Sequence, residues 1–175
     1  TGYFQADEGE GGFCMIVVSD TTPLISLLKI KRVDLLKELF GEVLIPQAVF
    51  DELTSDKRFQ VEADQICQKE FIFVKRVNVP ESVNILKRAT GLDQEAIVLT
   101  DELKADILLM DEARGRNVSA QMGLSIMGTI GILMAAYEEK ELTADEVREC
   151  IDGLQRAGRH IGQRHYQMLL SRLKD

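Results

Sequence analysis

ILLMD at residues 107–111, four apolar residues followed by an acid, is the stretch that decides the fold. An apolar run this short and continuous is typical of a strand buried on both faces, as in parallel sheets covered by helices. MIVVSD at residues 15–20 has the same form and also ends at an acid. If the two strands are neighbours in a parallel sheet, Asp20 and Asp111 lie at the same edge, and such sheets bind their ligands at that edge.

Strand and helix signals alternate along the rest of the chain. Further strands are expected at 43–45, 71–74 and 124–126, and helices at 34–40, 46–53, 61–70, 93–105, 112–121 and 128–140. Residues 80–90 fit neither pattern clearly. The alternation predicts an α/β fold, a three-layer α/β/α sandwich whose central parallel sheet has about four to five strands.

Hydroxyl side chains mark two helix starts. Thr22 precedes Pro23, which suits the first turn of a helix, so Thr22 is expected as its N-cap. Thr143 and Glu146 have the spacing of a capping box, and residues 143–175 are expected to form a C-terminal helical extension. An apolar stripe at helical spacing in this extension is expected to dock onto the domain or onto a second subunit: Tyr166, Leu169, Leu170 and Leu173.

Composition excludes several classes of protein. The 175 residues are 45% hydrophobic and 29% charged, which suits one globular domain and excludes a disordered or collagen-like chain. The net charge of −8 argues against a surface built throughout to bind nucleic acid, although a local basic patch or an acidic cation site stays open. No apolar run is long enough to span a membrane.

The termini and the cysteines indicate the cellular setting. Residues 1–14 are rich in glycine and are expected to be an extension or a cloning remnant, with a single domain over 15–175. No secretory signal is visible in the sequence, and three widely spaced cysteines are typical of reduced thiols, so a cytoplasmic location is expected. His160 and His165 are five residues apart, which argues against a histidine metal site on one helical face.

Acids at the ends of strands and helices are the candidate functional residues. Each taken alone has an ordinary interpretation: Asp93 as a helix N-cap, for example, and Glu52 as a solvated charge. Four carboxylates within about 5 Å of each other would cost about 3 kcal/mol per pair, or about 20 kcal/mol in all, more than the roughly 5–15 kcal/mol that holds a domain folded. Such a cluster must be protonated, spread out or filled by a cation. Oxygen ligands favour Mg²⁺ or Mn²⁺, and the chemistry that follows is metal-assisted phosphodiester hydrolysis.

Five segments together resemble the PIN domain superfamily, in particular its small prokaryotic branch related to the toxin ribonucleases of toxin–antitoxin modules. The segments are VSDTTPLISL at 18–27, IPQAVFDEL at 45–53, LDQEAIVL at 92–99, ADILLMDEARGR at 105–116 and MGTIGIL at 127–133. They cover about residues 15–140 in the order found in that branch.

The resemblance implies a Mg²⁺- or Mn²⁺-dependent endoribonuclease. Its metal-binding and catalytic acids would be Asp20, Glu52, Asp93 and Asp111. Thr22 would position a metal-bound water or ligand. The third segment departs from the usual pattern because no glycine precedes the acid; aligning it on Ala96 favours Asp93 and leaves Glu95 in reserve. Glu112 is the corresponding reserve for Asp111.

The resemblance also implies partners. RNA is the expected substrate, with Arg114 and Arg116 contacting its backbone or, in the simpler interpretation, lying on a solvated helix face. An antitoxin protein and a second copy of the chain in a homodimer are the expected protein partners.

Two alternatives stay open. A non-catalytic PIN-fold module, regulatory or RNA-associated, would keep the scaffold without the need to bind metal. A phosphotransfer protein also places an aspartate after a buried strand. A haloacid-dehalogenase phosphatase needs a second aspartate where this chain has Thr22, and a receiver domain needs paired acids where it has Ser19 and Asp20, so both are disfavoured.

Overall fold

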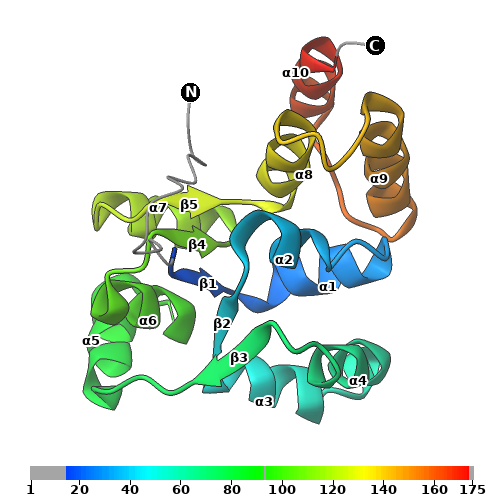
Figure 1. Ribbon diagram of the computed structural model, residues 1–175. Helices are drawn as coiled ribbons and strands as arrows, with labels where there is room; N and C mark the ends of the chain where they lie inside the picture. Colours follow the sequence, from blue (N-terminus) through cyan, green and yellow to red (C-terminus); the bar gives the residue numbers. More distant parts are fainter. Residues whose placement is uncertain (1–14, 93, 174–175) are drawn as a thin grey trace, which may run out of the picture.

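A five-stranded parallel sheet forms the centre of the protein in a computed structural model, which describes residues 15–92 and 94–173 (Figure 1). Its strands are β1 (Val17–Ser19), β2 (Val43–Pro46), β3 (Ile72–Lys75), β4 (Ile107–Leu109) and β5 (Ile126–Met127). They lie in the order β3-β2-β1-β4-β5, and each neighbouring pair is parallel. The expected sheet is therefore confirmed.

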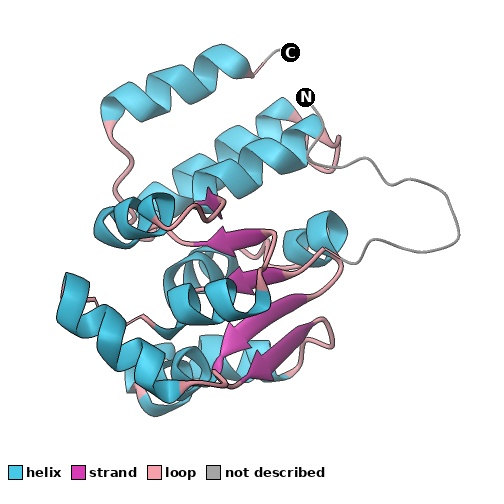
Figure 2. Ribbon diagram, turned by 90° about the vertical axis from the view of Figure 1, so that its left-hand side faces the viewer, coloured by secondary structure: helices cyan, strands magenta, loops and turns pink. Residues whose placement is uncertain are grey.

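Helices connect the strands and lie on both faces of the sheet, which gives the expected three-layer α/β/α sandwich (Figures 1 and 2). The helices are α1 (Thr21–Lys29), α2 (Leu35–Phe40), α3 (Gln47–Ser55), the short 3₁₀ helix η1 (Lys57–Phe59), α4 (Gln60–Cys67), α5 (Pro80–Thr90), α6 (Glu95–Leu103), α7 (Ala113–Gln121), α8 (Thr129–Glu138), α9 (Ala144–Arg156) and α10 (Gln163–Arg172). Within the described ranges, no helix is long and apolar enough to cross a membrane.

Successive residues of the central strands point into two different hydrophobic cores. Val17 and Ile107 pack into the core that includes α1, α2 and α8. Val18 and Leu108 pack into a second core that includes α6 on the opposite face. Because both faces are buried, every position of these strands must be apolar or small, and this explains the continuous apolar runs in the sequence.

The central pair of strands, β1 and β4, sets the position of everything at the carboxyl edge of the sheet. Val17 pairs with Ile107 and Ser19 with Leu109. The backbone N–H of Asp20 extends this pairing by donating to the carbonyl oxygen of Leu109 at 2.9 Å. The chain adds β2 and β3 on one side of β1 and then returns to add β4 and β5 on the other. A reversal of strand order of this kind leaves a crevice at the carboxyl ends of the two central strands.

Helix α1 begins two residues earlier than the sequence predicts. Thr21 is its first residue and Asp20 occupies the N-cap position, so the expectation of Thr22 as N-cap was wrong. The cause is the short β1–α1 connection, in which Asp20 is still bonded to β4 while the next residue is already helical. Pro23 then falls within the first turn, where the N–H that proline lacks would have had no partner in the helix.

Two other helix ends show how local chemistry sets the boundaries. The capping box of α9 is confirmed, because the Thr143 hydroxyl accepts from the N–H of Glu146 and the Glu146 carboxylate accepts from the N–H of Thr143. Residues 80–90, left unassigned from the sequence, form α5. This helix begins at Pro80 and ends at Gly91, whose φ of +76° favours glycine.

The C-terminal helix α10 docks onto the domain through the apolar stripe that the sequence predicts. Leu169 and Leu173 are only 5% and 6% exposed and belong to the same core as α1, α2 and α8. Tyr166 and Leu170 pack against that core. Figures 1 and 2 place α10 next to α8 at one end of the molecule.

We expect Leu169→Ala to lower the free energy of unfolding by about 2–5 kcal/mol, the usual cost of truncating a buried leucine. Urea denaturation measures this. Met168→Ala is the matched control, since Met168 is 48% exposed on the same helix and its truncation should change stability by less than about 1 kcal/mol. Equal effects of the two changes would show that α10 is not docked in this way.

Candidate metal and nuclease site

Asp20 and Asp111 leave the sheet at the same edge, as the sequence predicts. Asp20 directly follows β1, and Asp111 follows β4 after one further residue, Met110. Both side chains are half-buried. Because β1 and β4 are hydrogen-bonded neighbours, the two acids lie in the crevice where the strand order reverses.

The Asp20 carboxyl lies in an environment that disfavours its charge. Its pKa is raised from 3.8 to about 6, and burial is the largest cause. The backbone N–H of Thr21 opposes the shift, whereas the charges of Glu52, Glu112 and Asp111 each raise the pKa further. All the charged neighbours that contribute are acids. The charges that the described residues place next to Asp20 are therefore negative.

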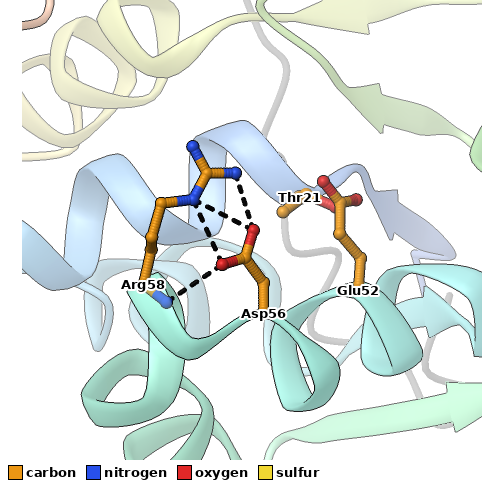
Figure 3. Close-up of polar contacts among 4 residues, drawn as sticks. All are labelled: Thr21, Glu52, Asp56 and Arg58. Carbon is orange, nitrogen blue, oxygen red and sulfur yellow. Dashed lines mark hydrogen bonds and ion pairs between the residues drawn. The ribbon is translucent and has the colours of Figure 1, made fainter.

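Glu52 faces this crevice from α3, which follows β2 directly. Its Oε2 accepts a hydrogen bond from the Thr21 hydroxyl at 2.7 Å, and Figure 3 shows the two side chains pointing toward one another. Thr21 was not among the residues singled out from the sequence. Thr22, which the resemblance singled out, is half-buried and donates no hydrogen bond to a described residue.

An ion pair lies beside Glu52 on the same side of the molecule (Figure 3). The Arg58 guanidinium contacts the Asp56 carboxylate at 2.6 Å and holds the pKa of that carboxyl below its usual range. Arg58 is thus paired with Asp56, at the start of η1. The charge of Glu52 also helps to raise the pKa of the Arg58 guanidinium, so Arg58 interacts with this acid of the crevice as well.

Asp111 is held by the start of α8. Its Oδ1 accepts from the backbone N–H of Thr129 at 2.7 Å, and its Oδ2 accepts from the Thr129 hydroxyl at 2.6 Å. Gly128 makes this approach possible, because a Cβ at that position would lie 2.9 Å from Asp111 Oδ1. Sequence reasoning missed Thr129, although a Gly-Thr pair between a strand and a helix was a visible signal.

The two reserve acids differ in their surroundings. Glu112 is exposed at the N-cap of α7 and accepts a hydrogen bond from the Gln94 side chain. Its charge raises the pKa of Asp20 more than that of Asp111 does. Glu95 is half-buried in the first turn of α6. Asp93, the first choice at this corner, lies outside the described residues.

The two arginines that follow Asp111 point to different places. Arg114 donates to the carbonyl oxygen of Thr90 at 2.7 Å, and this contact ties α7 to the end of α5. Arg116 makes no ion pair with any residue of 15–92 or 94–173 and lines a cavity together with Asp111. Of the pair, Arg116 is therefore the better placed for a ligand.

The side-chain oxygens of these acids are chemically suited to bind a hard divalent cation. They are carboxylate oxygens, and a bound cation would offset both the burial of Asp20 and the smaller repulsion from its acidic neighbours, which together raise its pKa. In the part of the chain that the structure describes, however, no three Asp, Glu, His or Cys side chains are arranged to hold one ion. Thr21 and Thr129 hold Glu52 and Asp111 in their present positions.

Comparison with known proteins identifies one family. The DUF3368 family, described as a PIN domain, matches residues 16–175. No curated protein and no solved structure matches the chain. The match extends from β1 through α10, so it includes the whole sheet and the C-terminal helices.

We expect Asp20→Asn to stabilise the protein at about pH 8 in EDTA, by up to roughly 3 kcal/mol, and not at about pH 4. The raised pKa means that the folded protein binds this proton more tightly than the unfolded chain does. The loss of folding stability caused by Asp20 is therefore absent below pH 3.8, the pKa of this group in the unfolded chain. It grows as the pH rises to about 6, the pKa in the folded protein. Urea denaturation at the two pH values measures it.

Asp152→Asn is the control for this experiment, because Asp152 is exposed on α9, far along the chain from the carboxyl edge. It should match the wild type at both pH values. If the difference in stability between Asp20→Asn and the wild type stays constant with pH, Asp20 does not have a raised pKa.

Proposed function

The chain belongs to the DUF3368 family of PIN domains, whose members are generally nucleases, and from this premise we propose that it is a metal-dependent endoribonuclease acting on RNA phosphodiester bonds. The observation that supports this most strongly is the Asp20 environment. Its half-buried carboxyl, whose contributing charged neighbours are acids, lies where the strand order reverses. Such a place is suited to a divalent cation and the phosphate that it recruits.

In this proposal Asp20, Glu52 and Asp111 hold the cation, with Asp93 as the fourth acid and Glu95 and Glu112 in reserve. Bound Mg²⁺ or Mn²⁺ would polarise the phosphodiester and lower the pKa of a water molecule, which then loses its proton more easily and becomes a better nucleophile. The Thr21 hydroxyl orients Glu52, and Thr129 orients Asp111 through both carboxylate oxygens. Arg116, which is unpaired among the described residues, would bind the RNA backbone, whereas Arg114 is engaged with α5.

We expect the wild type to cleave an unstructured single-stranded RNA in Mn²⁺ and to lose this activity in EDTA. Asp20→Asn should lower the cleavage rate about 100-fold or more, because it removes a charged ligand of the cation. A gel assay of end-labelled RNA measures the rate. The expected stability gain of this variant at neutral pH separates lost chemistry from lost folding.

Asp152→Asn serves again as the matched control and should cleave at the wild-type rate, since it removes an exposed aspartate outside the crevice. Cleavage that persists in EDTA, or that Asp20→Asn leaves unchanged, would contradict the proposal.

Thr129 is a positioning residue in this account. Thr129→Val removes the hydroxyl that bonds Asp111 and should weaken the apparent Mn²⁺ affinity about 10-fold. Thr129→Ser keeps the hydroxyl and should restore most of that affinity. The readout is the Mn²⁺ concentration that gives half-maximal cleavage. If valine and serine at this position behave alike, Thr129 has only a packing role.

A non-catalytic PIN-fold module is the second candidate. One observation favours it: the described residues contain no ready set of three ligands for an ion. Mn²⁺ binding discriminates, because a ligand that binds only the folded state raises the melting temperature. A nuclease should show this shift in the wild type and lose it in Asp20→Asn, whereas an inactive module need show none.

A more specific proposal is that the protein is the toxin of a toxin–antitoxin module. In this role it would act as a homodimer that an antitoxin inhibits. The resemblance of the five sequence segments supports it. The general nuclease proposal does not depend on it.

A further inference from the structure

A cavity of about 600 Å³ opens next to Asp111, between the β5–α8 connection and α10. Asp111, Arg116 and Gly128 line one part of it. The other side is formed by α10 and the segment leading into it, which contribute His160, His165 and Arg172, among others. Its volume is within the range of pockets that hold ligands about as large as one nucleotide.

The cationic side chains of this cavity have no partner among the residues that the structure describes. The side chains of Arg116 and Arg172 form no ion pair or hydrogen bond with residues 15–92 or 94–173, and the same holds for the side chains of His160 and His165. The protein as a whole carries a net charge of −8, so two unpaired arginines converging on one cavity are a local exception. An anionic group of a ligand could bind both of them.

The remainder of the cavity is largely apolar. Met127, Ile130 and Met134 contribute from β5 and α8, and Met168 contributes from α10. Gly131 belongs to the same wall, and a Cβ there would come within 2.8 Å of the Met127 side chain. The cavity therefore offers apolar contact and two imidazole rings beside its cationic groups.

We propose that this cavity binds one nucleotide of the RNA substrate, next to the bond that is cleaved; the proposal rests on the proposed nuclease function. Arg172 and Arg116 bind the phosphate of that nucleotide, and the apolar wall and the histidines receive its base. Single-stranded RNA presents a charged phosphate and a flat base in each unit, and proteins bind bases by packing them against apolar or aromatic side chains.

The position of the cavity favours RNA over a protein ligand. Asp111 belongs both to the cavity lining and to the acids of the crevice, so an RNA strand with its scissile phosphate at those acids reaches the cavity with a neighbouring nucleotide. The sequence argument against histidine metal ligands still holds. The two histidines nevertheless meet at one cavity, because the turn between α9 and α10 brings His160 beside the helix that carries His165.

The test is binding without cleavage. The affinity of a short fluorescein-labelled single-stranded RNA for the whole protein is measured by fluorescence anisotropy in EDTA, over a series of salt concentrations. Arg172→Gln should weaken the affinity about tenfold, since it removes a charge-assisted contact to phosphate. It should also reduce the slope of log affinity against log salt by about 0.7.

Arg164→Gln is the matched control, because Arg164 is exposed on α10 and does not line the cavity. It should leave both the affinity and the salt slope at their wild-type values. Urea midpoints equal to that of the wild type exclude unfolding as the cause of any change. Competition adds a second arm: a 5′-mononucleotide should displace the RNA more effectively than inorganic phosphate or the nucleoside alone.

Several results would overturn the inference. These are equal losses in Arg172→Gln and Arg164→Gln, competition by inorganic phosphate as strong as that by the mononucleotide, or displacement by an acidic peptide but not by a mononucleotide. Its failure is distinguishable from failure of the nuclease proposal. Mn²⁺-dependent cleavage without this binding pattern would disprove only the proposed nucleotide site. The binding pattern without cleavage would disprove only the proposed nuclease activity.

Discussion

The parallel pairing of β1 with β4 is the interaction on which the rest of the structure depends. It places the ends of two buried strands side by side. The backbone N–H of Asp20 adds one more hydrogen bond to the pair by donating to the carbonyl oxygen of Leu109. The strand order reverses at this pair, and sheets of this kind bind their ligands at such a point. Asp20 and Asp111 then share one edge of the sheet, where burial and, to a smaller extent, repulsion from Glu52, Glu112 and Asp111 raise the pKa of Asp20. Two cores, one on each face of the sheet, stabilise the arrangement against this repulsion.

The side chains around the crevice are positioned by helix starts. Thr21 lies in the first turn of α1 and Thr129 in the first turn of α8, and each donates its hydroxyl to an acid from another element. Asp111 also accepts a backbone N–H at the start of α8, where the helix dipole favours a negative charge. Gly128 allows the contact by leaving no Cβ against the carboxylate. Glu52 and Asp111 are therefore each held in a defined position by a threonine hydroxyl.

Much of the fold could be predicted from the sequence because the strongest signals were local. The apolar runs of β1 and β4, the capping box of α9 and the stripe of α10 each determine a structure by themselves, and each is confirmed. Helix α5 could not be assigned, because it buries none of its residues fully and Ile85 remains 64% exposed. The start of α1 was misplaced because a tertiary contact, the bond from Asp20 to β4, overrides the local preference for a hydroxyl cap.

The candidate site was less predictable, because it too depends on tertiary contacts between distant parts of the chain. Its acids follow strands and could be found in the sequence, but their partners come from distant segments. Thr129 lies 18 residues beyond Asp111, and Thr21 lies 31 residues before Glu52. His160 and His165 were set aside because their spacing does not suit one helical face, yet a turn brings both to the cavity beside Asp111. Side-chain convergence of this kind depends on packing that no local pattern encodes.

The central claim is that the acids at the carboxyl edge of β1 and β4 bind a divalent cation. The measurement that tests it most directly is a crystal structure of the protein soaked in Mn²⁺, with an anomalous difference map collected at the manganese edge. This account predicts a strong peak within coordination distance of Asp20, Asp111 and Glu52. A map without a peak there, from crystals in which the crevice is open to solvent, would contradict it.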